Sequence, residues 1–236
     1  MQTNKVDLFF CGDSFTWGEE LQGPEQNHHR REKERFSGVL AEQLGKTHEN
    51  ISRSGTSNDW IVKKSIEWFE KGNSCDTAII QFSHYYRWMW YDKNGKHHHM
   101  PAKWKEQDTH MKTTEKQEAQ KAYMSNVISE HFALDNYWKN MFLLRNYLKD
   151  KCNVIHLTLT ELPLGKNFWY ESVGNINIIE LIPFLKKDQS NFCPKLNSNI
   201  LDNNDNKRFS GAHPSTEGHK RIAQLIRETH LDKLST

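Results

Sequence analysis

Short apolar runs alternate with amphipathic segments along this chain, and that alternation constrains its fold more than any other feature. Strand composition is found at residues 6–11, near 48–52, at 77–82 and at 153–159. Helical spacing of apolar residues is found at 36–44, at 60–72, from about 116 to 149, and at 214–231. Strands that alternate with helices in this way predict an α/β fold with a mostly parallel sheet.

Three of the predicted helices carry local end signals. Gly45 follows the first helix, as glycine commonly does at a helix end. Ser57 or Asn58 is a suitable N-cap for the second helix. Pro214 stands in the first turn of the last helix, where its missing N–H costs nothing.

The chain is long enough for one domain with a sizeable core. At 236 residues it fits a single domain that carries insertions. Two stretches do not fit the alternation: residues 84–115 are crowded with aromatics and histidines, and residues 161–206 are apolar in patches but otherwise typical of loops. We expect both to be insertions at the loop edge of the sheet, within one domain spanning residues 1–236.

Charge and aromatic content exclude two classes of protein. With 32 Lys and Arg against 30 Asp and Glu, the formal net charge is +2, so no long-range field favours nucleic acid or an anionic membrane. The 8 Trp, 7 Tyr and 12 Phe supply apolar side chains that a disordered chain lacks. We therefore expect a folded protein without a membrane or nucleic-acid partner, while the oligomeric state stays open.

The amino terminus and the cysteines bear on the compartment. Residues 1–11 have neither the apolar core of a signal peptide nor the length of a membrane span. We expect a cytoplasmic protein. The four cysteines, which we interpret as reduced thiols, stand singly at Cys11, Cys75, Cys152 and Cys193.

Polar residues follow the expected strands, at the edge where an open α/β sheet binds its ligands. A serine nucleophile needs an imidazole to accept its proton and backbone N–H groups to hold the oxyanion. Ser14 and His213 can supply the first pair, and Gly55 lets a second backbone N–H approach without a side chain in the way. The Gly-x-Ser-x-Gly elbow of ordinary α/β-hydrolases is absent from the sequence.

Residues 9–18 read FFCGDSFTWG, and residues 50–59 read NISRSGTSND. These two blocks resemble the first two blocks of the SGNH or GDSL-type hydrolases. The resemblance implies the three-layer α/β/α, flavodoxin-like fold of a family of esterases, lipases and carbohydrate deacetylases. It also implies Ser14 as the nucleophile and Gly55 as an oxyanion donor, with no cofactor. The variant blocks further resemble SGNH-type proteins of large tailed bacteriophages, which implies a place in the host cytoplasm or the virion for a phage-encoded protein.

The other two family blocks are altered. The third normally carries Gly-x-Asn-Asp, whose Asn is the third oxyanion donor, but residues 81–84 read QFSH. Ser83 could substitute as that donor, or Asn58 could reach into the site. The last block is normally Asp-x-x-His, and residues 210–213 read SGAH. The resemblance therefore implies His213 as the catalytic base, with Ser210 in place of its acid partner.

Loss of the acid partner bears on activity, because it can slow a triad enzyme by about 10⁴-fold. Asp202 or Asp205 could fold back to replace it. Alternatively, the Ser210 hydroxyl or a backbone carbonyl could orient the ring, or the protein could be a poor catalyst. The sequence leaves these alternatives open.

Residues 84–115 hold an aromatic cluster and a histidine run. Residues 85–91 read YYRWMWY, with Trp104 nearby. These rings could wall a substrate cleft and stack on sugar rings, or they could pack the insertion against the main domain. The adjacent side chains of His97, His98 and His99 point in different directions and lack completing ligands, so we interpret the run as an exposed polar loop and expect no metal site.

The expected function is ester hydrolysis by a serine esterase or deacetylase, through Ser14 and His213. The aromatic insertion favours an O-acylated carbohydrate over a lipid as the substrate. We expect Asp13 to brace the loop by hydrogen bonds. The alternative is a catalytically weak or inactive module of the same fold with a binding or structural role, because two of the family blocks are altered.

Overall fold

Five parallel strands form the central sheet in this computed structural model, which describes residues 3–19, 21, 28–91, 97–100, 129–159, 172, 178–181 and 213–231. The strands are β1 (Lys5–Cys11), β2 (His48–Asn50), β3 (Ser74–Phe82), β6 (Asn153–Thr158) and β7 (Ile178–Glu180). Their order is β2-β1-β3-β6-β7, and every neighbouring pair is parallel. The predicted α/β fold with a mostly parallel sheet is confirmed, and this order is the flavodoxin-like one.

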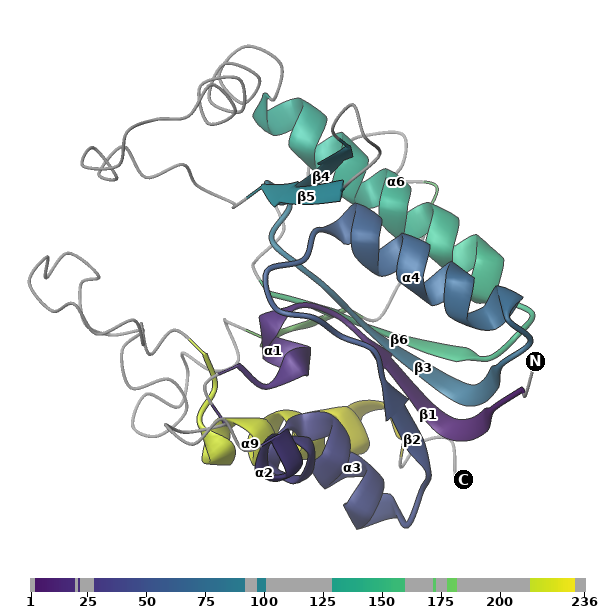
Figure 1. Cartoon of the computed structure of the whole chain (residues 1–236), viewed down its shortest axis with the longest axis vertical. Helices are drawn as coiled ribbons and strands as arrows, with labels where there is room; N and C mark the ends of the chain where they lie inside the picture. Colours follow the sequence, from purple (N-terminus) through teal and green to yellow (C-terminus); the bar gives the residue numbers. More distant parts are fainter. Residues whose placement is uncertain are drawn as a thin grey trace, which may run out of the picture.

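Helices cover both faces of the sheet and complete the three layers (Figure 1). Helices on one face are α4 (Asn58–Glu70) and α6 (Glu130–Leu148), and those on the other are α2 (His28–Glu34), α3 (Phe36–Leu44) and α9 (Thr216–Ile226). Pairs of helices in each layer contact one another, α4 with α6 and α3 with α9. Because both faces are covered, the central strands can be apolar throughout.

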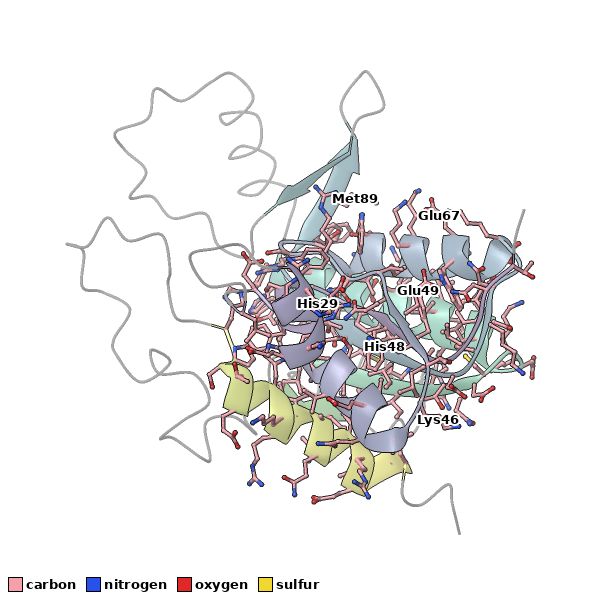
Figure 2. All side chains as sticks on the ribbon, turned by 60° about the horizontal axis from the view of Figure 1, so that its bottom comes forward. His29, Lys46, His48, Glu49, Glu67 and Met89 are labelled. Atoms are coloured by element: carbon pink, nitrogen blue, oxygen red, sulfur yellow. The ribbon has the colours of Figure 1, made fainter. Side chains whose placement is uncertain are left out.

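Apolar side chains fill the space on both sides of the sheet (Figure 2). Phe9 and Phe10 are adjacent in β1, so their side chains point to opposite faces, and both are fully buried. The ring of Trp68 from α4 stacks on Phe9, with centroids 4.3 Å apart. On the other face Phe36 of α3 meets Phe10 edge-on at 6.0 Å. One strand thus anchors both helical layers.

Local signals predict the ends of several helices well. α3 has the predicted bounds, and Gly45 ends it in the left-handed conformation, at φ 62°. Ser57 is the N-cap of α4, since its side chain accepts a hydrogen bond from the N–H of Trp60. The last helix begins later than predicted, because its N-cap is Ser215 and Pro214 therefore precedes the helix. It also ends earlier as an α-helix, since a π-helical turn (Arg227–Leu231) follows α9.

The sequence analysis does not predict three elements of the structure. α2 lies in a polar stretch, and β7 is a three-residue strand inside a region interpreted as loop. The third is an antiparallel hairpin of β4 (Trp88–Tyr91) and β5 (His97–Met100). The histidine run 97–99 therefore lies in a strand paired with β4, which corrects its interpretation as a polar loop. The remainder of 84–115, most of 161–206 and residues 116–128 lie outside the described residues.

Two further features concern the cysteines and the membrane. Cys11 and Cys75 are buried free thiols and Cys152 is a half-buried one, while Cys193 lies outside the described residues. No helix in the described part of the chain combines the length and the apolar character needed to cross a membrane.

Candidate active site

β1 carries Ser14 to the carboxyl edge of the sheet. The strand ends at Cys11, and a short helix, α1 (Ser14–Trp17), begins three residues later. Asp13 is the N-cap of α1, and its Oδ1 accepts a 3.1 Å hydrogen bond from the N–H of Phe15. Ser14 is 3% exposed. It therefore lies in the strand-to-helix turn that its sequence block predicts.

Gly12 lets this turn pack tightly against β3. A Cβ on Gly12 would lie 2.5 Å from Oγ1 of Thr16 and 2.9 Å from Oε1 of Gln81, which is closer than atoms can approach. Gln81 occupies this space because its Oε1 accepts hydrogen bonds from the Thr16 hydroxyl at 2.8 Å and from the N–H of Asp13 at 3.3 Å. The sequence analysis missed Gln81, although a glutamine inside an apolar strand is a signal of a buried polar contact.

The loop after β2 is tied to the same turn. The N–H of Arg53 donates to the carbonyl of Gly12 at 3.2 Å, and the Thr56 hydroxyl donates to the same oxygen at 3.4 Å. Gly55 lies between these two anchors. Its φ of 73° favours glycine, and the space where a Cβ would stand is open. The structure thus brings the loop of Gly55 to the turn of Ser14.

Asn50, at the end of β2, braces three segments with one amide group. Its Nδ2 donates to the carbonyl of Thr16 at 2.9 Å and to the hydroxyl of Ser37 at 2.8 Å. Its Oδ1 accepts from the N–H of Ser52 at 2.9 Å. The amide therefore joins α1, α3 and the loop after β2.

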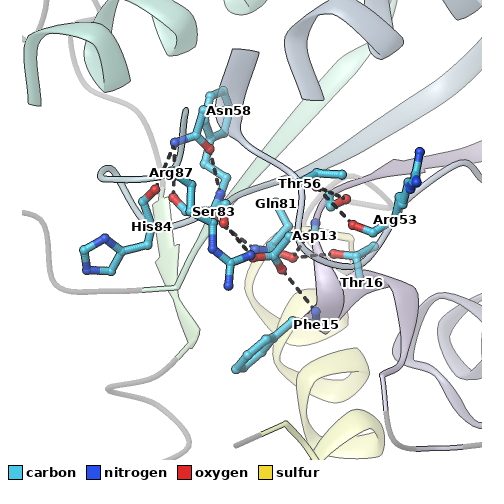
Figure 3. A network of polar contacts seen from close by, with 12 residues as sticks. Asp13, Phe15, Thr16, Arg53, Thr56, Asn58, Gln81, Ser83, His84 and Arg87 are labelled. Atoms are coloured by element: carbon cyan, nitrogen blue, oxygen red, sulfur yellow. Dashed lines mark hydrogen bonds and ion pairs between the residues drawn. The ribbon is translucent and has the colours of Figure 1, made fainter. Parts of the chain in front are cut away.

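A buried carboxylate, that of Asp13, lies at the centre of a polar network beside Ser14 (Figure 3). Asp13 is fully buried. Its Oδ2 accepts a 2.7 Å hydrogen bond from the Ser83 hydroxyl and a 3.2 Å ion-paired hydrogen bond from Nη1 of Arg87. A buried carboxylate needs such donors to offset its lost hydration. Through these hydrogen bonds Asp13 joins the turn of Ser14 to the loop after β3.

Asn58 and Ser83, the two alternatives for the third oxyanion donor, bind to each other. The N–H of Ser83 donates to Oδ1 of Asn58 at 2.7 Å, and Nδ2 of Asn58 donates to the carbonyls of Ser83 at 3.3 Å and His84 at 3.5 Å. The Ser83 hydroxyl donates to Asp13. The polar hydrogens of both side chains are thus engaged in holding the loop after β3.

His213 stands just before α9 and packs against the nucleophile turn. Its ring lies edge-on to that of Phe15, with centroids 5.6 Å apart and an interplanar angle of 61°. Since Phe15 follows Ser14, the structure brings the expected base to the turn that carries the expected nucleophile. The candidate partners of the imidazole lie outside the described residues and stay predictions: Asp202, Asp205 and Ser210.

A second histidine, His219, lies fully buried in α9. Its Nδ1 accepts a 3.1 Å hydrogen bond from the N–H of Phe36, which joins α9 to α3. Burial lowers the pKa of His219 to about 3, and Coulombic interactions with His213 and Arg35 contribute to the lowering. His219 is therefore neutral at neutral pH. A histidine among the apolar positions of the last helix was the signal for this role, which the sequence analysis missed.

Comparisons with known proteins bear on the fold. A scan against protein-family models and a search of curated proteins find no match. Among solved structures, an acetyl xylan esterase from Geobacillus stearothermophilus is 14% identical, and the likeness covers 97% of this chain and 96% of that one at a TM-score of 0.51. This chain has the SGNH hydrolase fold.

Two carbohydrate esterases share the SGNH fold with this chain. One is a family 2 enzyme with a carbohydrate-binding domain from Myceliophthora fergusii, 10% identical over 100% of this chain and 68% of that one, at a TM-score of 0.53. The other has an active site said to display divergent catalytic and non-catalytic binding functions. It is 12% identical over 98% of this chain and 70% of that one, at a TM-score of 0.50. At such low identity the likeness shows the fold alone.

In this SGNH fold the loop after β3 carries aromatic rings beside the Asp13 network. The rings of His84, Tyr85 and Tyr86 are half-buried. His84 stacks on Tyr85 with centroids 4.5 Å apart, and Tyr85 lies against Tyr86 at 4.6 Å with an interplanar angle of 38°. Trp88 is buried and stacks on Phe132 of α6 at 4.9 Å. Trp88 therefore packs the hairpin against the main domain, whereas the other three rings keep accessible surface.

The part of the SGNH fold described by the structure holds no group of three or more His, Cys, Asp or Glu side chains that could bind a metal ion. The backbone of residues 97–99 is described as part of β5, but their side chains are not. The side chains of Trp90 and Tyr91, and the whole of Trp104, also lie outside the described part.

Proposed function

We propose that this chain is a serine ester hydrolase in which Ser14 is the nucleophile and His213 is the general base. The observation that carries the proposal is the packing of the His213 ring on Phe15, the residue after Ser14, at 5.6 Å between centroids. It joins residues from opposite ends of the chain at the carboxyl edge of the sheet, where α/β folds bind ligands. A serine nucleophile needs its base within hydrogen-bond reach, and this packing supports the proposal because it brings the segment of His213 to the turn of Ser14.

The reaction begins when Oγ of Ser14 attacks the ester carbonyl carbon and His213 takes the hydroxyl proton. The backbone N–H groups of Ser14 and Gly55 donate to no acceptor within the described residues, so both are available to the oxyanion. Collapse of the tetrahedral intermediate expels the alcohol, which receives the proton from His213. Water then attacks the acyl-serine, with His213 again as base, and the carboxylic acid leaves.

An O-acetylated carbohydrate is the substrate class that the surroundings favour. His84, Tyr85 and Tyr86 offer stacked, half-buried rings next to the network behind Ser14. Flat rings with polar edges suit the apolar faces and hydroxyl edges of sugars. The likeness in fold to an acetyl xylan esterase and to two carbohydrate esterases supports the same choice.

A binding module that does not turn over its ligand is the second candidate. It is favoured by one observation: the Ser83 hydroxyl and the Asn58 amide are both engaged within their own loop, so neither replaces the family's third oxyanion donor. Serine at position 210, where the family has its acid, also favours a binding module. Such a module would bind its ligand at the same site without hydrolysing it.

Release of acetate from 4-nitrophenyl acetate and from acetylated xylo-oligosaccharides separates the two candidates. The wild type is compared with Ser14→Ala and His213→Ala, and with His131→Ala as a control at an exposed position on α6. We expect both site variants to lose at least about 10³-fold in kcat and the control to keep its rate. A wild type no faster than Ser14→Ala, yet able to bind the sugar, would favour the binding module.

A further inference from the structure

Arg87 enters the site from the loop after β3 and reaches the turn of Ser14 (Figure 3). Its Nη1 lies 3.2 Å from Oδ2 of Asp13, the residue immediately before Ser14. The Arg87 side chain is 23% exposed, whereas that of Asp13 is fully buried. One guanidinium nitrogen is therefore held by a buried carboxylate, while the side chain as a whole keeps accessible surface.

The anchor that holds Arg87 is itself rigid. Oδ1 of Asp13 caps α1 by accepting a hydrogen bond from the N–H of Phe15. Oδ2 accepts a 2.7 Å hydrogen bond from the Ser83 hydroxyl. A guanidinium carries five N–H donors in a planar fork, and the Asp13 contact uses one of them. Fixing one edge of a planar fork also fixes the direction of the other donors. The group is thus preorganised before any ligand arrives.

The hydrogens of Ser83 and Asn58, the two side chains expected to replace the family's third oxyanion donor, are engaged in other hydrogen bonds. The family's third block supplies an asparagine donor, and this chain has Ser83 there, with its hydroxyl turned to Asp13. The nearby Asn58 amide binds the carbonyls of Ser83 and His84. Among the described residues of this loop, Arg87 combines a contact with the buried Asp13 carboxylate and a side chain that keeps accessible surface.

We infer that Arg87 is a catalytic residue that donates to the oxyanion together with the N–H groups of Ser14 and Gly55. The inference rests on the proposed ester hydrolysis and names a donor that the sequence blocks do not contain. A guanidinium has N–H donors and no acceptor, so it is suited to donate to an oxyanion. Arg87 stabilises the negative charge that develops in the transition state. Its loss should therefore lower kcat more than it changes KM.

The test measures kcat and KM for 4-nitrophenyl acetate with the wild type, Arg87→Ala and Arg87→Lys. Arg87→Lys leaves a cation beside the buried Asp13 carboxylate but lacks the planar fork, so it separates folding from catalysis. Arg221→Ala, which removes an arginine of α9 outside the proposed site, is the control for the loss of one positive charge. Thermal unfolding of each variant shows whether it is folded, and millimolar guanidinium is added to test for rescue.

We expect kcat to fall by about 10²–10³-fold in both folded Arg87 variants, with KM nearly unchanged. Guanidinium should restore part of the activity of Arg87→Ala and none of that of Ser14→Ala. A folded Arg87→Lys that keeps kcat within about threefold, a change of less than 1 kcal/mol, would overturn the inference while leaving Ser14-dependent hydrolysis intact. A wild type without any Ser14-dependent hydrolysis would overturn both the inference and the proposed function.

Discussion

The hydroxyl of Ser83 donates a 2.7 Å hydrogen bond to Oδ2 of Asp13, across a separation of 70 residues in the chain. The bond joins the loop after β3 to the turn after β1, at the edge of the sheet where Ser14 lies. Together with the N–H of Phe15 and Nη1 of Arg87, it supplies a fully buried carboxylate with three donors. The turn of Ser14 is therefore held from two directions, by a helix cap and by the loop after β3.

Replacing Ser83 by alanine should lower the free energy of unfolding by about 1–3 kcal/mol, because a buried carboxylate loses one of its donors. Urea unfolding measures the change as a lower midpoint at an unchanged slope. Ser52→Ala is the matched control, since the Ser52 hydroxyl is buried yet makes no hydrogen bond within the described residues. Equal midpoints for the two variants would show that the Ser83 bond contributes nothing.

A methyl group at position 12 should disturb the nucleophile turn. In Gly12→Ala the new Cβ would meet Oγ1 of Thr16 at 2.5 Å and Oε1 of Gln81 at 2.9 Å. Relief of this overlap must move the Thr16 and Gln81 side chains and costs about 1–3 kcal/mol of stability, or more. We expect a matching loss of kcat, because Asp13 and Ser14 follow directly.

Gly45→Ala separates steric crowding from backbone strain. Gly45 has φ 62°, but open space surrounds the position of its Cβ. Strain alone should cost about 1–2 kcal/mol there and leave kcat unchanged, because Gly45 ends α3 away from the site. If Gly12→Ala were as stable and as active as the wild type, the close packing of the turn would be contradicted.

Two buried histidines should make the protein sensitive to acid. The pKa of His219 is lowered to about 3 and that of His156 to about 4, in both cases mainly by burial, with the Arg145 charge adding to the effect at His156. Between these values and the ordinary 6.5, the unfolded chain binds protons that the folded chain does not. The free energy of unfolding should therefore fall as the pH drops below about 6.5.

His156→Leu tests this acid sensitivity. Both ring nitrogens of His156 are buried without a hydrogen-bond partner within the described residues, so a leucine of similar size should preserve stability at pH 7. The variant should also lose up to about 1.4 kcal/mol per pH unit of the slope between pH 6.5 and 4. Urea midpoints at several pH values measure it. An unchanged slope would exclude His156 as a source of the acid sensitivity.

The sequence predicts those parts of the fold whose signals are local. α3 follows from apolar spacing and from Gly45, and β1 and β3 follow from runs that are apolar on both faces. β7 and the β4–β5 hairpin escape prediction because they are three or four residues long, too short for a period to stand out. The polar α2 escapes it because no apolar stripe marks its buried side.

The candidate site is predictable where a motif names its residues. Ser14 and Gly55 lie in recognisable blocks, and the structure places both loops at one edge of the sheet. The contacts of Arg87 and Gln81 with the turn cannot be predicted in this way. Arg87 lies 74 residues from Asp13, and its aromatic neighbours suggest packing more than electrostatics. Contacts between distant loops depend on the assembled sheet.

Covalent labelling of the protein with a fluorophosphonate tests the central claim most directly. Oγ of Ser14 attacks the phosphorus, fluoride leaves, and His213 takes the hydroxyl proton, so the phosphonylated serine can be located by peptide mass spectrometry. We predict one adduct on the peptide that contains Ser14, absent from Ser14→Ala and formed far more slowly by His213→Ala. A folded wild type that forms no adduct, or an adduct that persists in Ser14→Ala, would contradict the account.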